Sequence, residues 1–262
     1  MKKLHSAQHK KLPKFYVVIP ARYASTRLPG KPLLEIAGKP MVVCVVEQAQ
    51  KSGAKQTIVA TDDQRIVDAV NQHGYAAMLT RTDHVSGTDR IAEVALREDW
   101  HDDAIVVNVQ GDEPLIEVSL IVEVVKMLAN SKEAVMATAC YPIQSQSDFL
   151  NPNIVKVVLD GQSNALYFSR APIPYPRDAF ANNEEMPPNI PAYRHVGLYA
   201  YRTSFLKQYA NIQPAAIEQY ECLEQLRVLH QGYKIVVAIS KTPPATGVDT
   251  EHDLAYVRSI MQ

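Results

Sequence analysis

The sequence lacks a marked excess of either charge. It contains 27 Lys and Arg residues against 28 Asp and Glu residues, which gives a formal net charge of −1. This balance gives no electrostatic reason to expect nucleic acid or a membrane surface as a partner. The sequence also has no run of about eighteen apolar residues, which argues against a transmembrane helix. Any anion that the protein binds must therefore meet cations gathered at one place.

Cysteine is scarce as well. The three cysteines, Cys44, Cys140 and Cys222, form no C-x-x-C pair, and each lies in an apolar context. We therefore expect buried free thiols in a reducing compartment, rather than disulfides or a zinc site. No apolar stretch of signal-peptide length follows the basic segment 1–14. We expect this segment to be a flexible arm and the protein to be cytoplasmic.

Several common motifs are missing. The chain has neither G-x-x-x-x-G-K-[ST] nor G-x-G-x-x-G after a strand, which argues against a P-loop NTPase and a dinucleotide oxidoreductase. No D-x-D-type metal motif follows a predicted strand, although a glycosyltransferase would normally show one. The chemistry must therefore be sought in other loops between the predicted strands.

Apolar runs and amphipathic stretches alternate in the first half of the chain. Predicted strands cover 15–19, 56–61, 75–79 and 104–109, and predicted helices cover 40–51, 62–73 and 89–97. Strands separated by helices are typical of a parallel sheet with helices on both faces. We expect an α/β fold with a doubly wound, mostly parallel sheet, whose ligand loops lie at one edge.

The second half is less regular. The expected elements are a helix at 117–129, a strand at 134–141, a hairpin of strands at 154–159 and 165–169, a strand at 193–201, helices at 203–210 and 218–231, a strand at 234–240 and a helix at 251–261 capped by Thr250. The Pro-rich stretch 172–191 predicts a long mobile excursion, of a kind that can cover a substrate. We interpret this half as a smaller mixed α+β region added to the main sheet.

The first predicted strand runs into a cationic loop at 20–32. This loop carries Arg22, Arg27 and Lys31, the charges that phosphate oxygens need. In open α/β sheets ligands bind beyond the carboxyl ends of the strands, where this loop begins. The loop therefore predicts a site for a phosphorylated ligand. The alternative is a solvated basic turn.

Carboxylates follow two other predicted strands. Asp112 lies in the turn Asn108–Pro114 and Asp249 lies in the loop 243–250. Each alone could be a solvated acid at a turn or beside a helix. Together with a cationic loop, two such carboxylates are what a Mg²⁺-assisted phosphoryl or nucleotidyl transfer needs. Mg²⁺ typically takes one or two protein carboxylates, and phosphates and water complete its octahedron.

A family resemblance begins in the loop at 20–32, with the letters PARYASTRLPGKP. This sequence motif resembles that of the sugar nucleotidyltransferases that activate acidic sugars with CTP. The resemblance is strongest to the 3-deoxy-manno-octulosonate (Kdo) cytidylyltransferases, or CMP-Kdo synthetases. The resemblance continues to the C-terminus through 59–62, 80–84, 86–88, 108–114, 151–153, 155–160, 165–170, 194–195, 223–227 and 246–250. It implies transfer of CMP from CTP to the anomeric hydroxyl of Kdo, with release of pyrophosphate, for lipopolysaccharide biosynthesis.

The resemblance also implies roles for individual residues. Arg22, Arg27 and Lys31 match positions that hold the CTP phosphates, Asp112 and Asp249 match the Mg²⁺ ligands, Arg81, Ser86 and Gln110 match the cytosine site, and Arg177, His195, Tyr199, Glu224 and Gln225 match the sugar site. It implies a homodimer, in which 15–140 mainly binds the nucleotide, 141–232 binds sugar and the partner, and 233–262 returns to the main sheet.

Other interpretations stay open at this point. The acceptor could be sialic acid or an 8-amino analogue of Kdo, or the nucleotide could differ, because a hydroxylated pocket discriminates poorly between close analogues. A catalytically silent nucleotide-binding protein is a further alternative, although it would not need both Asp112 and Asp249. From the residues alone, Tyr199 and His195 could belong to a packed strand, and Glu224 with Gln225 to a solvated helix face.

Overall fold

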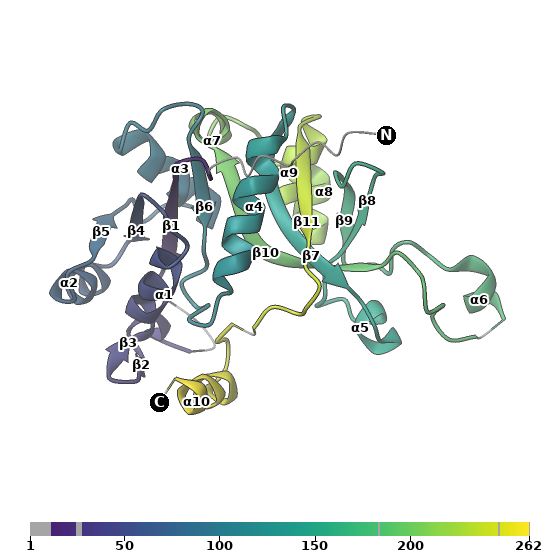
Figure 1. The fold of residues 1–262 in the computed structure, drawn as a ribbon, viewed down its shortest axis with the longest axis horizontal. Helices are drawn as coiled ribbons and strands as arrows, with labels where there is room; N and C mark the ends of the chain where they lie inside the picture. Colours follow the sequence, from purple (N-terminus) through teal and green to yellow (C-terminus); the bar gives the residue numbers. More distant parts are fainter. Residues whose placement is uncertain (1–11, 25–27, 183, 246, 262) are drawn as a thin grey trace, which may run out of the picture.

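The computed structural model describes residues 12–24, 28–182, 184–245 and 247–261. The predicted phosphate-binding Arg27 and most of the predicted N-terminal arm lie outside these residues. The central feature is a mixed sheet with the strand order β11-β7-β10-β6-β1-β4-β5 (Figure 1). Its strands are β1 (Phe15–Ala21), β4 (Gln56–Thr61), β5 (Ala76–Leu79), β6 (Ile105–Asn108), β7 (Ala134–Pro142), β10 (Tyr193–Arg202) and β11 (Lys234–Ile239).

The strand directions bring the loops to one edge. Strands β6, β1, β4 and β5 are parallel, and β11 is parallel to β7. Strand β10 lies antiparallel between β6 and β7, so β7 and β11 run in the same direction as β6. The carboxyl ends of these six strands and the amino end of β10 therefore meet at one edge of the sheet. The expectation of a mostly parallel sheet is confirmed.

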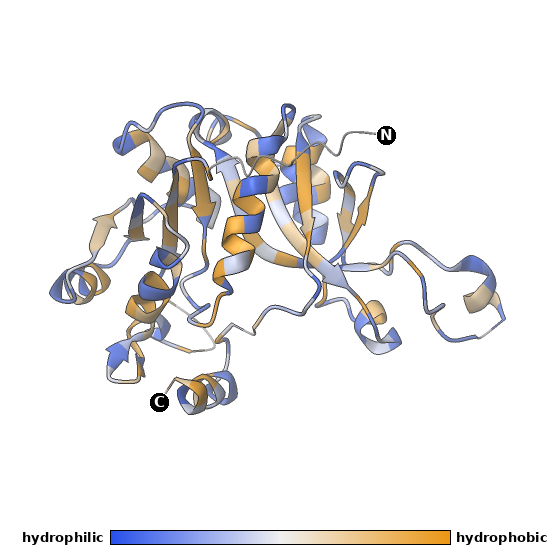
Figure 2. Cartoon of the chain, in the orientation of Figure 1, coloured by the Kyte–Doolittle hydropathy of each residue, from blue (hydrophilic) through white to orange (hydrophobic). Residues whose placement is uncertain are grey.

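Helices cover both faces of this sheet. One face carries α1 (Met41–Gln50), α2 (Gln64–Gln72) and α4 (Val118–Asn130), and the other carries α3 (Gly87–Arg97), α7 (Thr203–Tyr209), α9 (Gln225–His230) and the hairpin β8 (Lys156–Leu159) with β9 (Ala165–Ser169). Successive residues of a strand point to opposite faces, so Val17 and Ile19 join one core and Val18 joins the other. Figure 2 shows the resulting hydrophobic interior between sheet and helices. The doubly wound fold is confirmed.

The Pro-rich stretch extends away from the body of the protein (Figure 1). This arm contains α6 (Arg177–Ala181) and is joined at its base by α5 (Gln146–Leu150), which the sequence did not predict. A small apolar cluster that includes Phe149 and Ile154 holds the base of the arm. Strand β10 returns from the arm into the middle of the main sheet.

The prediction of one helix at 218–231 is wrong. The chain forms two helices there, α8 (Ala216–Glu221) and α9, because Cys222 between them adopts a left-handed conformation with φ of 52°. Cys222 is also exposed, which contradicts the prediction that all three cysteines are buried, whereas Cys44 and Cys140 are buried as expected. Glu224 and Gln225 consequently lie at the start of α9 rather than within a long helix.

The C-terminal helix α10 (Glu251–Ile260) begins at Thr250, whose side chain accepts a hydrogen bond from the Asp253 backbone as the sequence predicted. It packs near the short helix η1 (Lys31–Leu33) and the small hairpin of β2 (Glu35–Ile36) and β3 (Lys39–Pro40). Among the described residues, no helix combines the length and apolarity that a membrane crossing requires.

Candidate active site

Three neighbouring chambers line the loop edge of the sheet. The first, of about 340 Å³, contains Arg22, Lys31, Gln110, Asp112 and Asp249. The second, of about 600 Å³, lies between the start of α3 and the α8–α9 turn and contains Gln110, His195 and Glu224. The third, of about 400 Å³, contains His195, Asp112 and Asp249. Because each pair of chambers shares lining residues, we describe them as one cleft.

Lys31 and the two predicted metal carboxylates meet in the first chamber. The Lys31 Nζ atom lies 2.5 Å from Asp112 Oδ2 and 3.1 Å from Asp249 Oδ1, and it donates to the Val248 carbonyl at 2.9 Å. These carboxylates are separated by 137 positions in the sequence but face one cation. The joint arrangement that the sequence predicted is therefore present.

The same arrangement tests whether the residues suit Mg²⁺. Two carboxylate oxygens already face a common cation, and carboxylate oxygens are ligands that Mg²⁺ prefers. Within the described part of the chain, no group of three or more His, Cys, Asp or Glu side chains could hold a metal ion. The donor set therefore fits an ion that completes its shell with phosphate and water.

Gly111 allows the acidic turn to approach β1. A Cβ atom at this position would lie 2.8 Å from the Pro20 carbonyl oxygen, closer than real Cβ contacts. The backbone N–H of Val248 donates to the Asp112 carbonyl at 2.8 Å, which ties the loop after β11 to the same turn. Close packing of three loops thus places Asp112 beside Lys31.

A hydrogen-bond network joins the cationic loop to the loop 80–86. Arg22 donates to the His84 carbonyl at 2.6 Å. The Glu93 carboxylate on α3 contacts His84 Nε2 at 2.5 Å and accepts from the Arg81 backbone N–H at 3.0 Å. The Arg81 guanidinium itself is exposed and pairs with Asp83, so it lines none of the three chambers.

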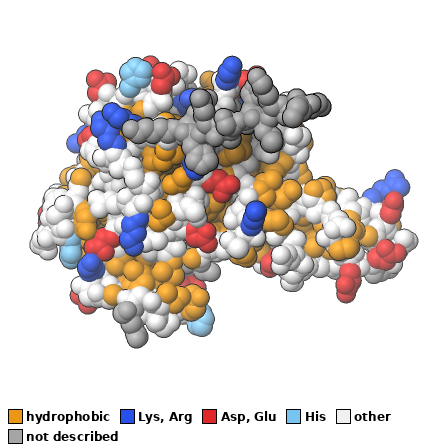
Figure 3. Space-filling view, in the orientation of Figure 1, with side chains coloured by type: hydrophobic (Ala, Val, Ile, Leu, Met, Phe, Trp, Pro, Cys, Tyr) orange, Lys and Arg blue, Asp and Glu red, His pale blue; other side chains and the backbone are white. Residues whose placement is uncertain are grey.

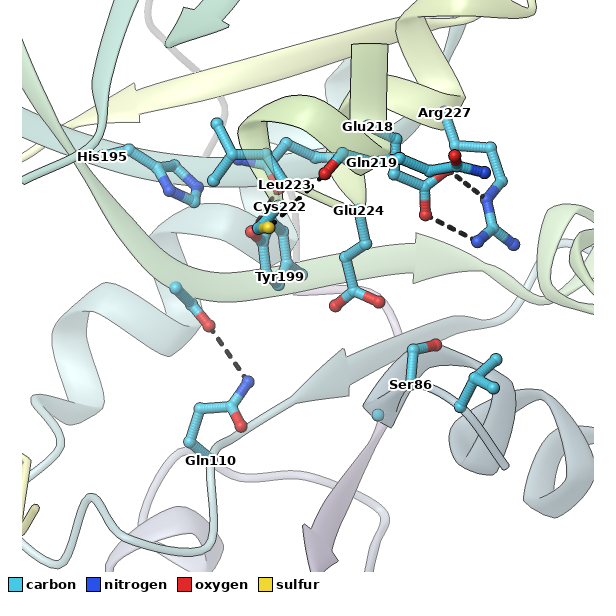
Figure 4. Close-up of a pocket in the computed structure, with 14 residues that line it drawn as sticks. Ser86, Gln110, His195, Tyr199, Glu218, Gln219, Cys222, Leu223, Glu224 and Arg227 are labelled. Atoms are coloured by element: carbon cyan, nitrogen blue, oxygen red, sulfur yellow. Dashed lines mark hydrogen bonds and ion pairs between the residues drawn. The ribbon is translucent and has the colours of Figure 1, made fainter. Parts of the chain in front are cut away.

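Ser86 and Gln110 face the second chamber. Ser86 is the N-cap of α3 and forms a capping box with Asp89, which fixes the start of the helix at the chamber wall. Gln110 follows β6 and donates from Nε2 to the Gly197 carbonyl at 3.4 Å (Figure 4). Both residues therefore lie where a ligand that spans the first and second chambers would pass.

His195 and Tyr199 enter the second chamber from β10. The Thr138 hydroxyl oxygen lies 3.0 Å from His195 Nε2 and 2.8 Å from the Leu198 carbonyl oxygen. When the hydroxyl proton goes to the Leu198 carbonyl, His195 Nε2 donates to Thr138 and Nδ1 is left as an acceptor. Burial lowers the pKa of His195 to about 3, so the ring is neutral at physiological pH.

Gln225 is buried and Glu224 is half-buried, so neither lies on a solvated helix face. Figure 4 shows the Glu224 carboxylate pointing across the chamber toward Ser86. Gln225 accepts from the Tyr199 hydroxyl at 3.3 Å, and burial raises the pKa of the Glu224 carboxyl. Glu224 Oε2 and Gln225 Nε2 have no hydrogen-bond partner among the described residues. Because buried polar atoms are normally hydrogen-bonded, these two atoms favour the binding of a polar ligand.

The comparisons with known proteins agree with this geometry. A family model described as cytidylyltransferase matches residues 16–235. The chain belongs to the cytidylyltransferase family. Its structure is similar, with a TM-score of 0.84 and 42% identity, to a solved structure of CMP:2-keto-3-deoxy-manno-octonic acid synthetase complexed with CTP. The match covers 95% of this chain and 98% of that one, and it confirms the resemblance seen in the sequence.

A second solved structure supports the fold alone. It is a cytidylyltransferase from Leptospira borgpetersenii serovar Hardjo-bovis, with 16% identity and a TM-score of 0.60. This match covers 94% of the present chain and 85% of the Leptospira chain. The α/β sheet of the cytidylyltransferase family is thus kept at low identity.

One predicted sugar-site residue of this cytidylyltransferase lies far from the others. Arg177 begins α6 on the arm, is exposed, and donates from Nε to Asp178 Oδ1 at 2.9 Å. It lines none of the three chambers. Within one chain, the cleft therefore gathers Arg22, Lys31, Ser86, Gln110, Asp112, His195, Tyr199, Glu224, Gln225 and Asp249 but not Arg81 or Arg177.

Two residues that the sequence analysis did not single out line the third chamber of this cytidylyltransferase. Burial and the neighbouring Asp112 raise the pKa of Glu113 to about 8, and its Oε2 atom has no described partner. Arg194 contributes a cation beside the same acids. Glu113 is next to Asp112 in the sequence, and Arg194 is next to His195. Only the fold shows that both side chains line the third chamber.

Proposed function

We propose that the protein transfers CMP from CTP to the anomeric hydroxyl of Kdo and releases pyrophosphate. The observation that carries the proposal is the 42% identity, over 95% of the chain, to the synthetase solved with CTP. The cleft supports it, because a chamber with two cations for phosphates and two carboxylates for a metal ion adjoins a chamber with buried polar atoms for a polyol. Kdo is the sugar acid named in that synthetase.

The first chamber supplies the electrostatics of the transfer. Asp112 and Asp249 would hold Mg²⁺, which when bound neutralises charge on the phosphates. Arg22 and Lys31 stabilise the negative charge that develops on the departing pyrophosphate. A bond forms between the sugar oxygen and the α-phosphorus as the bond to the bridging oxygen breaks. The hydroxyl proton passes to solvent, and no protein base is assigned.

The second chamber orients the acceptor. The neutral His195 ring has one donor and one acceptor nitrogen, and Gln225 Nε2 is a buried donor without a described partner. Hydrogen bonds to sugar hydroxyls would satisfy these atoms and Glu224 Oε2. Because an unmade buried hydrogen bond costs about 1–3 kcal/mol, these groups favour a hydroxyl-rich acceptor over an apolar one.

We also propose a homodimer formed through 141–232, a cytoplasmic location, and delivery of the product to lipopolysaccharide synthesis. The dimer is supported by exposed apolar side chains in that region, with 47% exposure for Leu150, 61% for Leu166 and 63% for Tyr175. Figure 3 shows hydrophobic side chains along the part of the molecule that extends from the body. Apolar surface of this kind is typical of an interface.

Pyrophosphate release tests the reaction. We would measure it with CTP, Mg²⁺ and Kdo, beside sialic acid, 8-amino-Kdo and the other three nucleoside triphosphates. We expect release with CTP and Kdo, lost in Asp112→Asn and kept in the exposed Asp103→Asn control. If pyrophosphate were released only with another acceptor, that acceptor would replace Kdo as the proposed substrate. CTP binding without release from any acceptor would instead identify a silent binding protein.

A further inference from the structure

The third chamber contains a cation that has no counter-ion among the described residues. Arg194 lies at the amino end of β10, opposite Tyr141 of β7, and its guanidinium is 5.7 Å from the centroid of the Tyr141 ring. It lines the chamber together with Asp112 and Asp249 and is half-buried. None of the described carboxylates lies within ion-pair distance of this guanidinium, so its charge and its N–H donors are available to a ligand.

Other arginines near the cleft are already engaged. Arg22 donates to the His84 carbonyl, and Arg227 forms a two-bond pair with Glu218. Arg170 donates to the carbonyl of Glu221. A partly buried arginine whose donors are unused, in a chamber lined by acids, points to an anionic ligand that brings its own oxygen acceptors.

The acceptor of the proposed reaction carries such an anion. In a 2-keto-3-deoxy acid the carboxylate is attached to the carbon that bears the reacting anomeric hydroxyl. When that hydroxyl meets the α-phosphate beside Asp112 and Asp249, the carboxylate must lie close to the same two residues. Arg194 shares a chamber with both of them, whereas Arg177 does not.

We propose that Arg194 binds the carboxylate of the acceptor and selects acidic sugars over neutral ones. The proposal rests on the function proposed above and deepens it. His195, the next residue on β10, lines both the second and the third chamber. The sugar hydroxyls therefore lie toward Glu224 and the carboxylate toward Arg194, on either side of the 195–197 segment. The Tyr141 ring fixes the guanidinium by a cation–π contact.

A comparison of two acceptors tests the role of the charge. We would measure pyrophosphate release from CTP with Kdo and with its methyl ester, for the wild type, Arg194→Gln and Arg194→Lys. We expect Arg194→Gln to lose about 10- to 100-fold in kcat/KM for the acid, mainly through KM. The ester should show no comparable loss, and Arg194→Lys should fall between. The KM for CTP should stay constant.

The controls separate this role from a structural one. Lys207 is half-buried and lines none of the three chambers, so Lys207→Gln should keep the wild-type preference for acid over ester. An equal loss for acid and ester in Arg194→Gln, or weaker CTP binding by calorimetry, would overturn the proposal. The proposal would also be overturned if Arg177→Gln lost the preference for acid over ester while Arg194→Gln kept it.

Pyrophosphate is the other small anion in this cleft. If Arg194 held pyrophosphate instead, Arg194→Gln would weaken product inhibition by pyrophosphate and keep the acid preference, which would also overturn the proposal. A wild-type protein that releases no pyrophosphate with Kdo would contradict the proposed function itself, so the two failures are distinguishable.

Discussion

The Lys31 ammonium lies between Asp112 and Asp249, the two carboxylates proposed to hold a metal ion. Its Nζ atom contacts both carboxylates, at 2.5 and 3.1 Å. One side chain therefore has two opposing effects on the site. It competes with a divalent cation for the same oxygens, and it supplies positive charge to the triphosphate.

Lys31→Met should separate these two effects. Without nucleotide, we expect the variant to bind Mn²⁺ more tightly than the wild type, because no ammonium competes for the carboxylates. The KM for CTP should rise about 10- to 100-fold, because a charge-assisted contact is lost. Titration calorimetry with Mn²⁺ and steady-state kinetics measure the two quantities. The exposed Lys55→Met is the control, and weaker Mn²⁺ binding by Lys31→Met would contradict the competition.

His195 should make stability depend on pH. Its folded pKa is about 3, below the unfolded value near 6.5, because burial disfavours the charged ring. Between these values the unfolded chain binds more protons, so stability is lost as the pH falls below 6.5. We expect this residue alone to remove about 2 kcal/mol of unfolding free energy between pH 6.5 and pH 5.

Urea unfolding at both pH values checks this expectation. His195→Asn should have a smaller pH-dependent loss than the wild type, by about the same 2 kcal/mol. The control is His101→Asn, whose ring is 83% exposed, and it should follow the wild type. Parallel pH curves for the wild type and His195→Asn would show that the folded ring titrates normally.

The loop 80–86 is positioned by helix α3. Glu93 accepts from the Arg81 backbone and contacts the His84 ring, and Arg22 reaches the His84 carbonyl. The nucleotide side of the cleft therefore depends on a carboxylate that lines none of the three chambers.

Glu93→Ala should loosen this loop. We expect the KM for CTP to rise about 10-fold, because a network of charge-assisted bonds is broken, while the KM for Kdo changes little. Glu98→Ala, at the residue that directly follows the same helix and accepts from Gln56, is the matched control. Steady-state kinetics with each substrate varied in turn measures both constants. An equal rise in both would indicate a general loss of packing instead.

The regular elements of the sheet could be predicted because their signals are local. The strands at 56–61 and 165–169 have the predicted bounds, since a short apolar run between turn residues suffices to define them. The break between α8 and α9 could not be predicted, because Cys222 adopts a conformation that non-glycine residues seldom take and that tertiary contacts must hold.

The site was predicted in part, and for a similar reason. Lys31, Asp112 and Asp249 follow or precede buried strands, and topology brings such positions to one edge. Arg177 is different, because its place depends on where the arm extends, and no local pattern encodes that direction. Whether a cation is paired also depends on residues that are distant in the sequence. The role proposed for Arg194 therefore became apparent only from the fold.

The C-terminal segment packs against the residues that follow β1, beside the cleft. Val248 and the α10 residue Leu254 share a small core with Ile36 and Met41, next to the cationic loop. Arg258 of α10 also donates to the Glu35 carbonyl at 2.8 Å. Asp249 directly follows Val248 of this cluster and lines the first chamber. A nucleotide bound with its metal ion would therefore contact the first sheet strands and the last loop together.

CTP with Mg²⁺ should stabilise the entire molecule against heat. A ligand at 100 times its Kd adds about 2.7 kcal/mol to the unfolding free energy, which corresponds to a rise of about 5–10 °C in Tm for a chain of this size. CTP with EDTA should give a smaller rise, and so should Asp249→Asn with CTP and Mg²⁺, because each removes the link between phosphates and the C-terminal loop. Differential scanning calorimetry measures these shifts, with Asp103→Asn as the control. A second transition that CTP leaves in place would show instead that the C-terminal segment unfolds independently of the cleft.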